Sequence, residues 1–198
     1  MPSTLTMETY RVKIQRGLIE RLGLEILRLN DNIDNEILLI TDIENSNLYL
    51  QKIIMNLQEY PRNAGMKLRF CELIINSCED AKNFEAVSNL LEKMAELGLS
   101  KKCIVACLGN DVVCSVAGFA ARCFSVRLVP VPVTLSAMIE ASSGGSALLN
   151  LNAGKNLAAM PYAPSLVLCD TECLKDSPCY ESEDIIKRCV KSKTENIL

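Results

Sequence analysis

The sequence contains no histidine in its 198 residues. Histidine is the most frequent general base near neutral pH and the commonest side-chain ligand of catalytic metals. Its absence excludes a metal held through imidazole, and also a serine or cysteine nucleophile that imidazole activates. Only oxygen or sulfur ligands remain available to a metal ion.

The sequence also lacks long apolar runs and an excess of basic residues. No run reaches the roughly 18–20 apolar residues that cross a bilayer, and the first ten residues lack the basic and apolar regions of a signal peptide. With 21 Lys and Arg against 24 Asp and Glu, the net charge is −3, which does not indicate nucleic-acid binding. We therefore expect a cytoplasmic protein with no membrane or nucleic-acid partner.

The ten cysteines do not suggest disulfides, because several lie inside apolar runs. Cys103 and Cys107 belong to KCIVACLG and Cys169 to SLVLCD, where each is expected to be a small buried hydrophobe. The Cys-x3-Cys spacings, of Cys103 with Cys107 and of Cys169 with Cys173, are not the Cys-x2-Cys spacing of structural zinc sites. We predict reduced thiols in the core.

Short apolar runs alternate with segments of helical periodicity, and hydrophobic residues make up 49% of the chain. Strands are expected at residues 9–14, 37–42, 67–75, 103–108, 128–131 and 166–170. Helices are expected at residues 18–29, 46–60, 84–97, 112–124 and 134–140, with Pro61 ending the second and Gly98 closing the third. A loop of small residues follows at 141–146, and a basic amphipathic helix is expected at 183–197.

This alternation predicts an α/β fold: a Rossmann-like, mostly parallel sheet with helices on both faces. We expect one domain over residues 9–178, followed by a short helical tail over 179–198. In such folds ligands bind beyond the carboxyl ends of the strands. Those ends carry Asp42, the segment 109–111, Thr134 and Asp170.

Four short blocks then resemble the pattern of a known family. Residues 109–121 (GNDVVCSVAGFAA) resemble G-G-G-V-x-G-D-x-x-G-F-x-A, and residues 132–135 (PVTL) resemble P-T-T-L. Residues 142–146 (SSGGS) stand where the pattern has S-x-G-G-K, and residues 154–157 match G-K-N-L outright. Pro164 and Asp170 follow at the expected distances. The order and spacing resemble the nucleotide-binding half of 3-dehydroquinate synthase and its sugar phosphate cyclase relatives, over residues 9–178.

The resemblance implies an NAD- and zinc-dependent, phosphate-eliminating cyclase (a lyase) of the shikimate pathway to aromatic amino acids. The intact enzyme oxidises a seven-carbon sugar acid phosphate with NAD, eliminates phosphate, reduces the ketone again and closes a carbocycle. The family binds zinc through one glutamate and two histidines of a helical C-terminal domain. We expect that domain, and zinc with it, to be absent from this chain.

The resemblance also implies NAD contacts. It places Asp42, Glu79 and Lys82 near the adenosine end, where a carboxylate accepts hydrogen bonds from ribose hydroxyls. The alternative is that Asp42 merely ends a strand and that Glu79 and Lys82 form a solvated pair. The other cofactor-binding candidates are Gly109, Asn110, Asp111, Ser115, Thr134 and Asp170.

Several of these positions depart from the family pattern. Asn110 and Asp111 replace two glycines of the phosphate-binding turn; asparagine tolerates a left-handed backbone, but Asp111 places a negative charge beside an anionic ligand. Cys114 and Ser115 replace a Gly-Asp pair, which removes a carboxylate from the nicotinamide side. NAD binding is therefore expected to be weakened.

The catalytic candidates are also altered. Ser146 occupies the position of a lysine, which removes an ammonium from the substrate pocket, while Glu140 stands where the family has an acid. Lys155 and Asn156 remain as candidate substrate contacts; their alternative is a lysine at a helix start and a capping asparagine. In the tail, Arg188 and Lys193 resemble phosphate-facing residues of a later family helix, with a basic solvated helix face as the alternative.

Three functions stay open on these observations. The chain is a synthase-like protein that keeps a partial NAD site and is inactive alone, a non-catalytic subunit, or a decayed paralogue. A subunit would form a homodimer or pair with a partner chain that supplies a helical domain. A fourth, weakly supported option is a zinc-independent enzyme that uses Cys114, whose position at a helix start could lower its pKa.

Overall fold

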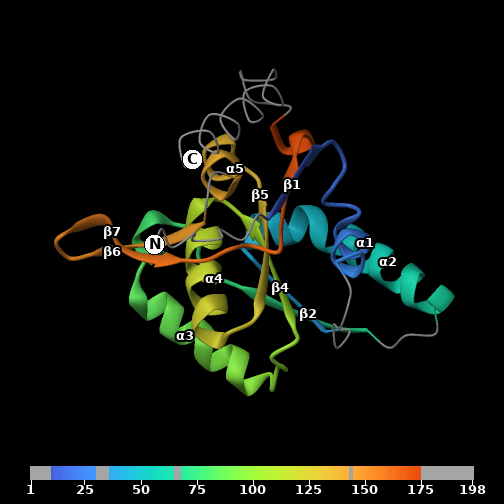
Figure 1. Ribbon diagram of the computed structural model, residues 1–198, viewed down its shortest axis with the longest axis horizontal. Helices are drawn as coiled ribbons and strands as arrows, with labels where there is room; N and C mark the ends of the chain where they lie inside the picture. The colour runs from blue at the N-terminus through green and yellow to red at the C-terminus, as the bar shows by residue number, and fades with distance from the viewer. Residues whose placement is uncertain (1–9, 30–35, 65–67, 143–144, 175–198) are drawn as a thin grey trace, which may run out of the picture.

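A parallel four-stranded sheet forms the centre of the molecule (Figure 1). The computed structural model describes residues 10–29, 36–64, 68–142 and 145–174. The strands are β2 (Glu36–Thr41), β3 (Arg69–Ile74), β4 (Ile104–Gly109) and β5 (Arg127–Pro132), in the order β3-β2-β4-β5. Every residue of β2 and β4 is buried, as their continuous apolar runs predict.

A second parallel pair continues this arrangement beside β5. Strand β1 (Arg11–Gln15) pairs with β8 (Leu166–Asp170), and the Ser165 amide donates to the Leu128 carbonyl at 2.9 Å. Leu166 and Leu168 of β8 pack with one core cluster, whereas Val167 and Cys169 pack with another. Strand β8 is therefore buried on both faces, like β2 and β4.

Helices cover both faces of the sheet, which confirms the predicted fold class (Figure 1). The five helices of the described residues are α1 (Leu22–Leu27), α2 (Ile43–Ala64), α3 (Phe84–Glu96), α4 (Asp111–Phe124) and α5 (Leu135–Ser142). Leu38 and Ile40 of β2 share a cluster with α3 and α4, whereas Ile37 and Leu39 share one with α1 and α2. Gly98 adopts φ +59° after α3, as expected of a residue that ends a helix.

Two helix boundaries differ from the expected ones. Helix α2 continues past Pro61 to Ala64, so the prediction that Pro61 ends it is wrong. A proline removes the hydrogen bond of its own N–H and crowds the carbonyl four residues before it, but only three helical residues follow Pro61. Helix α1 spans six residues rather than twelve. Leu18 and Ile19, which were expected in its first turn, are buried in the turns that precede it.

None of the described helices is long and apolar enough to cross a membrane.

An antiparallel hairpin, absent from the expected elements, follows α5. It consists of β6 (Ser146–Leu151) and β7 (Gly154–Pro161), and it extends from the body of the molecule as the orange strands of Figure 1. Ala147 and Leu149 anchor it, because both are buried in the cluster that contains α3 and α4. The alternative that placed Lys155 and Asn156 at a helix start is wrong, since both residues lie in β7.

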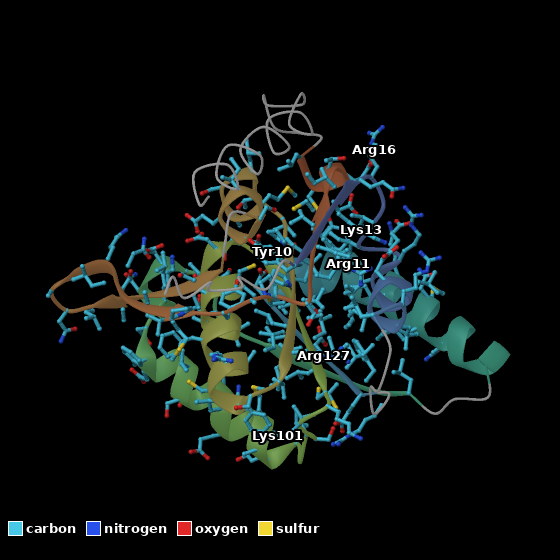
Figure 2. The ribbon with its side chains drawn as sticks, in the orientation of Figure 1. Tyr10, Arg11, Lys13, Arg16, Lys101 and Arg127 are labelled. Atoms are coloured by element: carbon cyan, nitrogen blue, oxygen red, sulfur yellow. The ribbon has the colours of Figure 1, made fainter. Side chains whose placement is uncertain are left out.

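Strand β1 lies at the edge of its sheet and carries basic side chains (Figure 2). Lys13 forms an ion pair with Glu25 of α1, which is itself buried. Beyond the end of the strand, Arg16 pairs with Glu172 at 3.1 Å. Charged side chains on an edge strand oppose pairing with a strand of another molecule. The expected tail helix, with Arg188 and Lys193, lies outside the described residues.

Asp170 joins β8 to the turn that follows β1. Its carboxylate is 2% exposed and accepts hydrogen bonds from the amides of Gly17 (2.9 Å), Ile19 (2.9 Å) and Glu172 (3.0 Å). Gly17 adopts φ +71°, which directs the chain away from β1 at this point. The carboxylate therefore satisfies three backbone donors, of which the Ile19 amide is buried and would otherwise lack a partner.

Replacing Asp170 by alanine is expected to lower the free energy of unfolding by about 2–4 kcal/mol, because three amides lose a charged acceptor. Urea denaturation of the purified chain measures the loss. The matched control is Glu172→Gln, which alters an exposed ion pair and should change the free energy by less than about 1 kcal/mol. Equal urea midpoints for Asp170→Ala and the wild-type chain would contradict this role.

Candidate nucleotide site at the carboxyl ends of the strands

The polar residues expected at the carboxyl ends of the strands lie along one edge of the parallel sheet. Asp42 follows β2, Asn110 follows β4, Thr134 lies beyond β5 and Asp170 ends β8. Parallel strands end at the same edge, so their order in the sheet brings these residues to one side of the molecule. Thr134 caps α5, where its Oγ1 accepts from the Ala137 amide at 3.3 Å.

Asp42 caps the start of α2. Its Oδ1 accepts from the amides of Glu44 and Asn45, both at 3.0 Å, and its Oδ2 accepts from Asn45 Nδ2 at 2.7 Å. The residue is 4% exposed. These contacts are those of a helix cap. They favour the alternative that Asp42 has a structural role at the end of its strand and does not contact a ribose.

Glu79 and Lys82 do not pair with each other. Glu79 Oε1 accepts from Asn150 Nδ2 at 2.9 Å and lies 3.7 Å from Lys155 Nζ. The Lys82 side chain is 2% exposed, and its Nζ donates to Asp111 Oδ2 at 3.0 Å. The alternative of a solvated Glu79–Lys82 pair is therefore wrong, because Lys82 is buried and its ammonium is directed to the first turn of α4.

Asn110 occupies the turn between β4 and α4 in a fully bonded arrangement. Its Oδ1 accepts from the amides of Val112 (3.1 Å) and Val113 (3.2 Å), and its Nδ2 donates to the Ser77 carbonyl at 3.0 Å. Its backbone is extended, with φ −75°, so the left-handed conformation considered for this position is not used. An extended cap with a side-chain acceptor is what a helix start requires.

Gly109 is needed for packing between strand and helix. A β-carbon at this position would lie 2.7 Å from Val113 Cβ, which real contacts do not allow. Its carbonyl accepts from the Val133 amide at 3.0 Å. The glycine that matches the family pattern therefore lets α4 start close to the end of β4.

A pocket lies beside this turn and gathers four of the expected positions: Asp111, Ser115, Glu140 and Ser146. Its lining is completed by Cys114, Ala137, Ala141 and Tyr162. The pocket encloses about 280 Å³ of empty space, open solvent included. Lys155 and Asn156 are not among its lining residues; Lys155 is 74% exposed on the hairpin.

Tyr162 and Asn150 are two site residues that the sequence did not point to. Burial raises the pKa of the Tyr162 phenol, and the neighbouring thiols of Cys107 and Cys114 raise it further. The Tyr162 amide donates to the Gly145 carbonyl at 2.9 Å, and a β-carbon on Gly145 would lie 2.0 Å from the Tyr162 carbonyl oxygen. In the sequence, only the Gly-Gly pair of the family pattern indicated that another part of the chain approaches the backbone closely at Gly145.

Cys114 is a protonated thiol rather than an activated one. A hydrogen bond with Cys107 raises its pKa well above the ordinary value, burial adds to the shift, and the thiol donates to the Gly109 carbonyl at 3.8 Å. The expectation of a lowered pKa at a helix start is wrong, because the sulfur is buried against another thiol and a carbonyl. Cys103, Cys107 and Cys169 are buried and free, which confirms the predicted core thiols.

The residues at this edge offer different groups to the two ends of a dinucleotide. The Glu79 side chain is 39% exposed and offers a carboxylate to ribose hydroxyls. The amides of Val112 and Val113 already donate to Asn110, and Asp111 adds a negative charge beside them. Over the described ranges, no cluster of three cysteines or acidic residues could hold a metal ion.

The parallel sheet, its two helical layers and the polar carboxyl edge define a Rossmann-like α/β domain. The profile of the family described as 3-dehydroquinate synthase N-terminal matches residues 72–184. The chain belongs to this family, as the four sequence blocks predicted.

Curated relatives agree with this assignment. The 3-dehydroquinate synthase of Prochlorococcus marinus subsp. pastoris is 32% identical over 179 residues, covering 89% of this chain and 48% of the relative. That of Clostridium acetobutylicum is 28% identical over 178 residues, covering 87% of this chain and 48% of the relative. The chain thus spans about half the length of the curated relatives it matches.

Solved structures of sugar phosphate cyclases share the fold. A 2-epi-5-epi-valiolone synthase from Streptomyces hygroscopicus subsp. jinggangensis, with NAD⁺ and Zn²⁺ bound, superposes with a TM-score of 0.78 at 21% identity, covering 98% of this chain and 63% of that one. A 2-deoxy-scyllo-inosose synthase complexed with carbaglucose-6-phosphate, NAD⁺ and Co²⁺ gives a TM-score of 0.70 at 24% identity, covering 85% of this chain and 44% of that one. At these identities the likeness concerns the fold.

The raised pKa of Cys114 leads to a prediction about thiol reactivity. At neutral pH, iodoacetamide should alkylate Cys114 about a hundredfold more slowly than the exposed Cys123, because only the thiolate reacts. Peptide mass spectrometry after timed quenching measures both rates in one sample. Labelling in denaturant serves as the control and should remove the difference. Equal rates in the folded chain would show that Cys114 is an accessible thiolate.

Proposed function

We propose that the chain is a 3-dehydroquinate synthase-like protein that binds NAD weakly at the carboxyl edge and is catalytically inactive alone. The observation that carries this proposal is the grouping of Ser115, Glu140 and Ser146 around one pocket in a member of this family. At two of these three positions, Ser115 and Ser146, the chain lacks a charged side chain that the family pattern has there. The proposal places the chain among cytoplasmic pseudoenzymes of the shikimate pathway.

NAD binding is supported by the fold and by the adenosine-end residues. Two neighbours of the same fold, the valiolone and inosose synthases, are described with NAD⁺ bound. Glu79 presents a partly exposed carboxylate at the edge where a Rossmann-like fold receives its ligand. When bound, NAD supplies hydride-transfer chemistry; the protein's own residues bind and orient it.

Inactivity of the isolated chain is supported by what these residues lack. None of the 198 residues is a histidine, so the chain provides no imidazole for zinc. Ser146 lines the pocket where the family pattern has a lysine, and a hydroxyl cannot bind phosphate or carboxylate as an ammonium does. Zinc is therefore proposed to be absent from the isolated chain.

The second candidate function is an interaction subunit, a homodimer or a chain that pairs with a helical partner. The hairpin favours it, because its tip presents Leu151 (43% exposed) and Leu157 (58% exposed). A decayed paralogue without selected activity is the third candidate. A specific, stoichiometric complex in sizing and pull-down experiments separates the second candidate from the third.

Glu79→Ala is expected to weaken NAD binding by about tenfold or more, because a carboxylate that accepts ribose hydrogen bonds is removed. Isothermal titration calorimetry measures the affinity. The matched control is Glu85→Ala, an exposed acid in the first turn of α3, which should leave the affinity unchanged. The absence of NAD binding by the wild-type chain would contradict the cofactor proposal.

The purified chain, supplied with NAD, Zn²⁺ and the seven-carbon sugar acid phosphate, is expected to release no phosphate above background. A colorimetric phosphate assay measures release, and a full-length bacterial 3-dehydroquinate synthase serves as the positive control. Turnover by the purified chain alone would refute the proposed inactivity and would require oxygen or sulfur ligands for the metal.

A further inference from the structure

At the first turn of α4, the Asn110 side chain bonds to backbone groups, and the side chains of Lys82 and Asp111 bond to each other. Asn110 accepts from the amides of Val112 and Val113 while its own amide donates to Ser77. Lys82 donates to Asp111 at 3.0 Å. The donors of this helix start and the one nearby buried ammonium are therefore engaged within the chain.

The start of a helix that follows a parallel strand attracts anions. Its free amides point outward and its dipole favours negative charge, which is why phosphates bind there in dinucleotide folds. In this chain Asp111 is the acidic residue of the first turn of α4. The negative charge that the helix start and Lys82 favour is thus supplied by a side chain of the protein.

The pair is partly buried, with its ammonium inside the fold and its carboxylate at the pocket. The Lys82 side chain is 2% exposed, while that of Asp111 is 33% exposed and borders the pocket. A buried ammonium must keep an anionic partner, because desolvation of an unpaired charge is costly. Asp111 can be displaced only if another anion replaces it beside Lys82.

We propose that Asp111 and Asn110 occupy the phosphate position of this site, so that the site selects nucleosides against their phosphorylated forms. This inference rests on the proposed function, because it concerns the same nucleotide site and identifies what weakens NAD binding there. Asn110 fills the backbone donors and Asp111 provides the anion. The residual affinity comes from the adenosine end, where Glu79 lies.

The test compares adenosine, ADP and NAD by isothermal titration calorimetry. The wild-type chain is expected to bind ADP and NAD no more tightly than adenosine. In Asp111→Gly, which leaves Lys82 without its anion, ADP and NAD should bind at least tenfold more tightly than in the wild type, with adenosine unchanged. The matched control is Asp80→Asn, which removes one exposed acid from the neighbouring turn and should alter none of the three affinities.

A second variant and a second measurement distinguish a change in phosphate binding from misfolding of Asp111→Gly. Asn110→Gly frees the two helix amides but keeps the Lys82–Asp111 pair, and it should raise ADP affinity severalfold. Thermal unfolding of Asp111→Gly should occur at a lower temperature than that of the wild type in chloride. Sodium pyrophosphate should restore the melting temperature of Asp111→Gly more than sodium chloride of equal ionic strength, and it should leave the wild type unchanged.

The outcomes separate this inference from the proposed function. The inference is overturned if the wild-type chain binds ADP more tightly than adenosine, or if Asp111→Gly gains no affinity for ADP and NAD. The proposal that the chain binds NAD stands in both cases. If pyrophosphate stabilises Asp111→Gly but the chain binds neither adenosine nor NAD, the result supports the inference that Asn110 and Asp111 occupy the phosphate position. The same result refutes the proposal that the chain binds NAD. If the wild-type chain, Asp111→Gly and Asn110→Gly all fail to respond to any of these ligands, both the inference and the cofactor proposal are overturned.

Discussion

The buried ammonium of Lys82 is the constraint on which the site depends. With 2% of its side chain exposed, it cannot be hydrated, and leaving it unpaired costs several kcal/mol. Asp111 meets this requirement from the start of α4. The Lys82 carbonyl also accepts from the Asn150 amide at 2.7 Å, and Asn150 in turn donates to Glu79. The turn after β4, the segment around Glu79 and the hairpin are thus joined in one network.

This network explains how a chain can keep a nucleotide-binding fold while its ligand contacts change. In a site built for a diphosphate, the helix amides and a lysine remain free until the ligand arrives. Here Asn110 and Asp111 bond to those groups, so the groups have partners without a ligand. Because Asp111 also lines the pocket that contains Glu140 and Ser146, the same carboxylate adds negative charge where the family pattern has a lysine.

The sheet could be predicted because its strands carry a local signal. β2, β4 and β8 are short apolar runs, and burial on both faces requires such runs. The hairpin could not be predicted in the same way, because its turn lacks an Asn-Gly or Asp-Gly pair and most of β7 is exposed. The end of α2 was also mispredicted: proline disfavours a helix locally, yet three helical residues follow Pro61.

The candidate site was predictable in its location but not in its pairings. The carboxyl ends of parallel strands meet at one edge, so Asp42, Asn110, Thr134 and Asp170 could be placed there from their positions alone. The partner of Lys82 lies 29 positions away, and nothing local distinguishes Asp111 from Glu79 as that partner. Likewise, asparagine tolerates a left-handed backbone in a phosphate-binding turn, whereas Asn110 caps a helix start with an extended backbone.

A crystal structure of the chain soaked with NAD tests the central claim most directly. If side chains of the protein occupy the phosphate position, the adenosine moiety will be ordered beside Glu79, the pyrophosphate will lie away from α4, and Lys82 will remain bonded to Asp111. A pyrophosphate oxygen within hydrogen-bonding distance of the Val112 and Val113 amides, with the Asn110 side chain displaced, would contradict it.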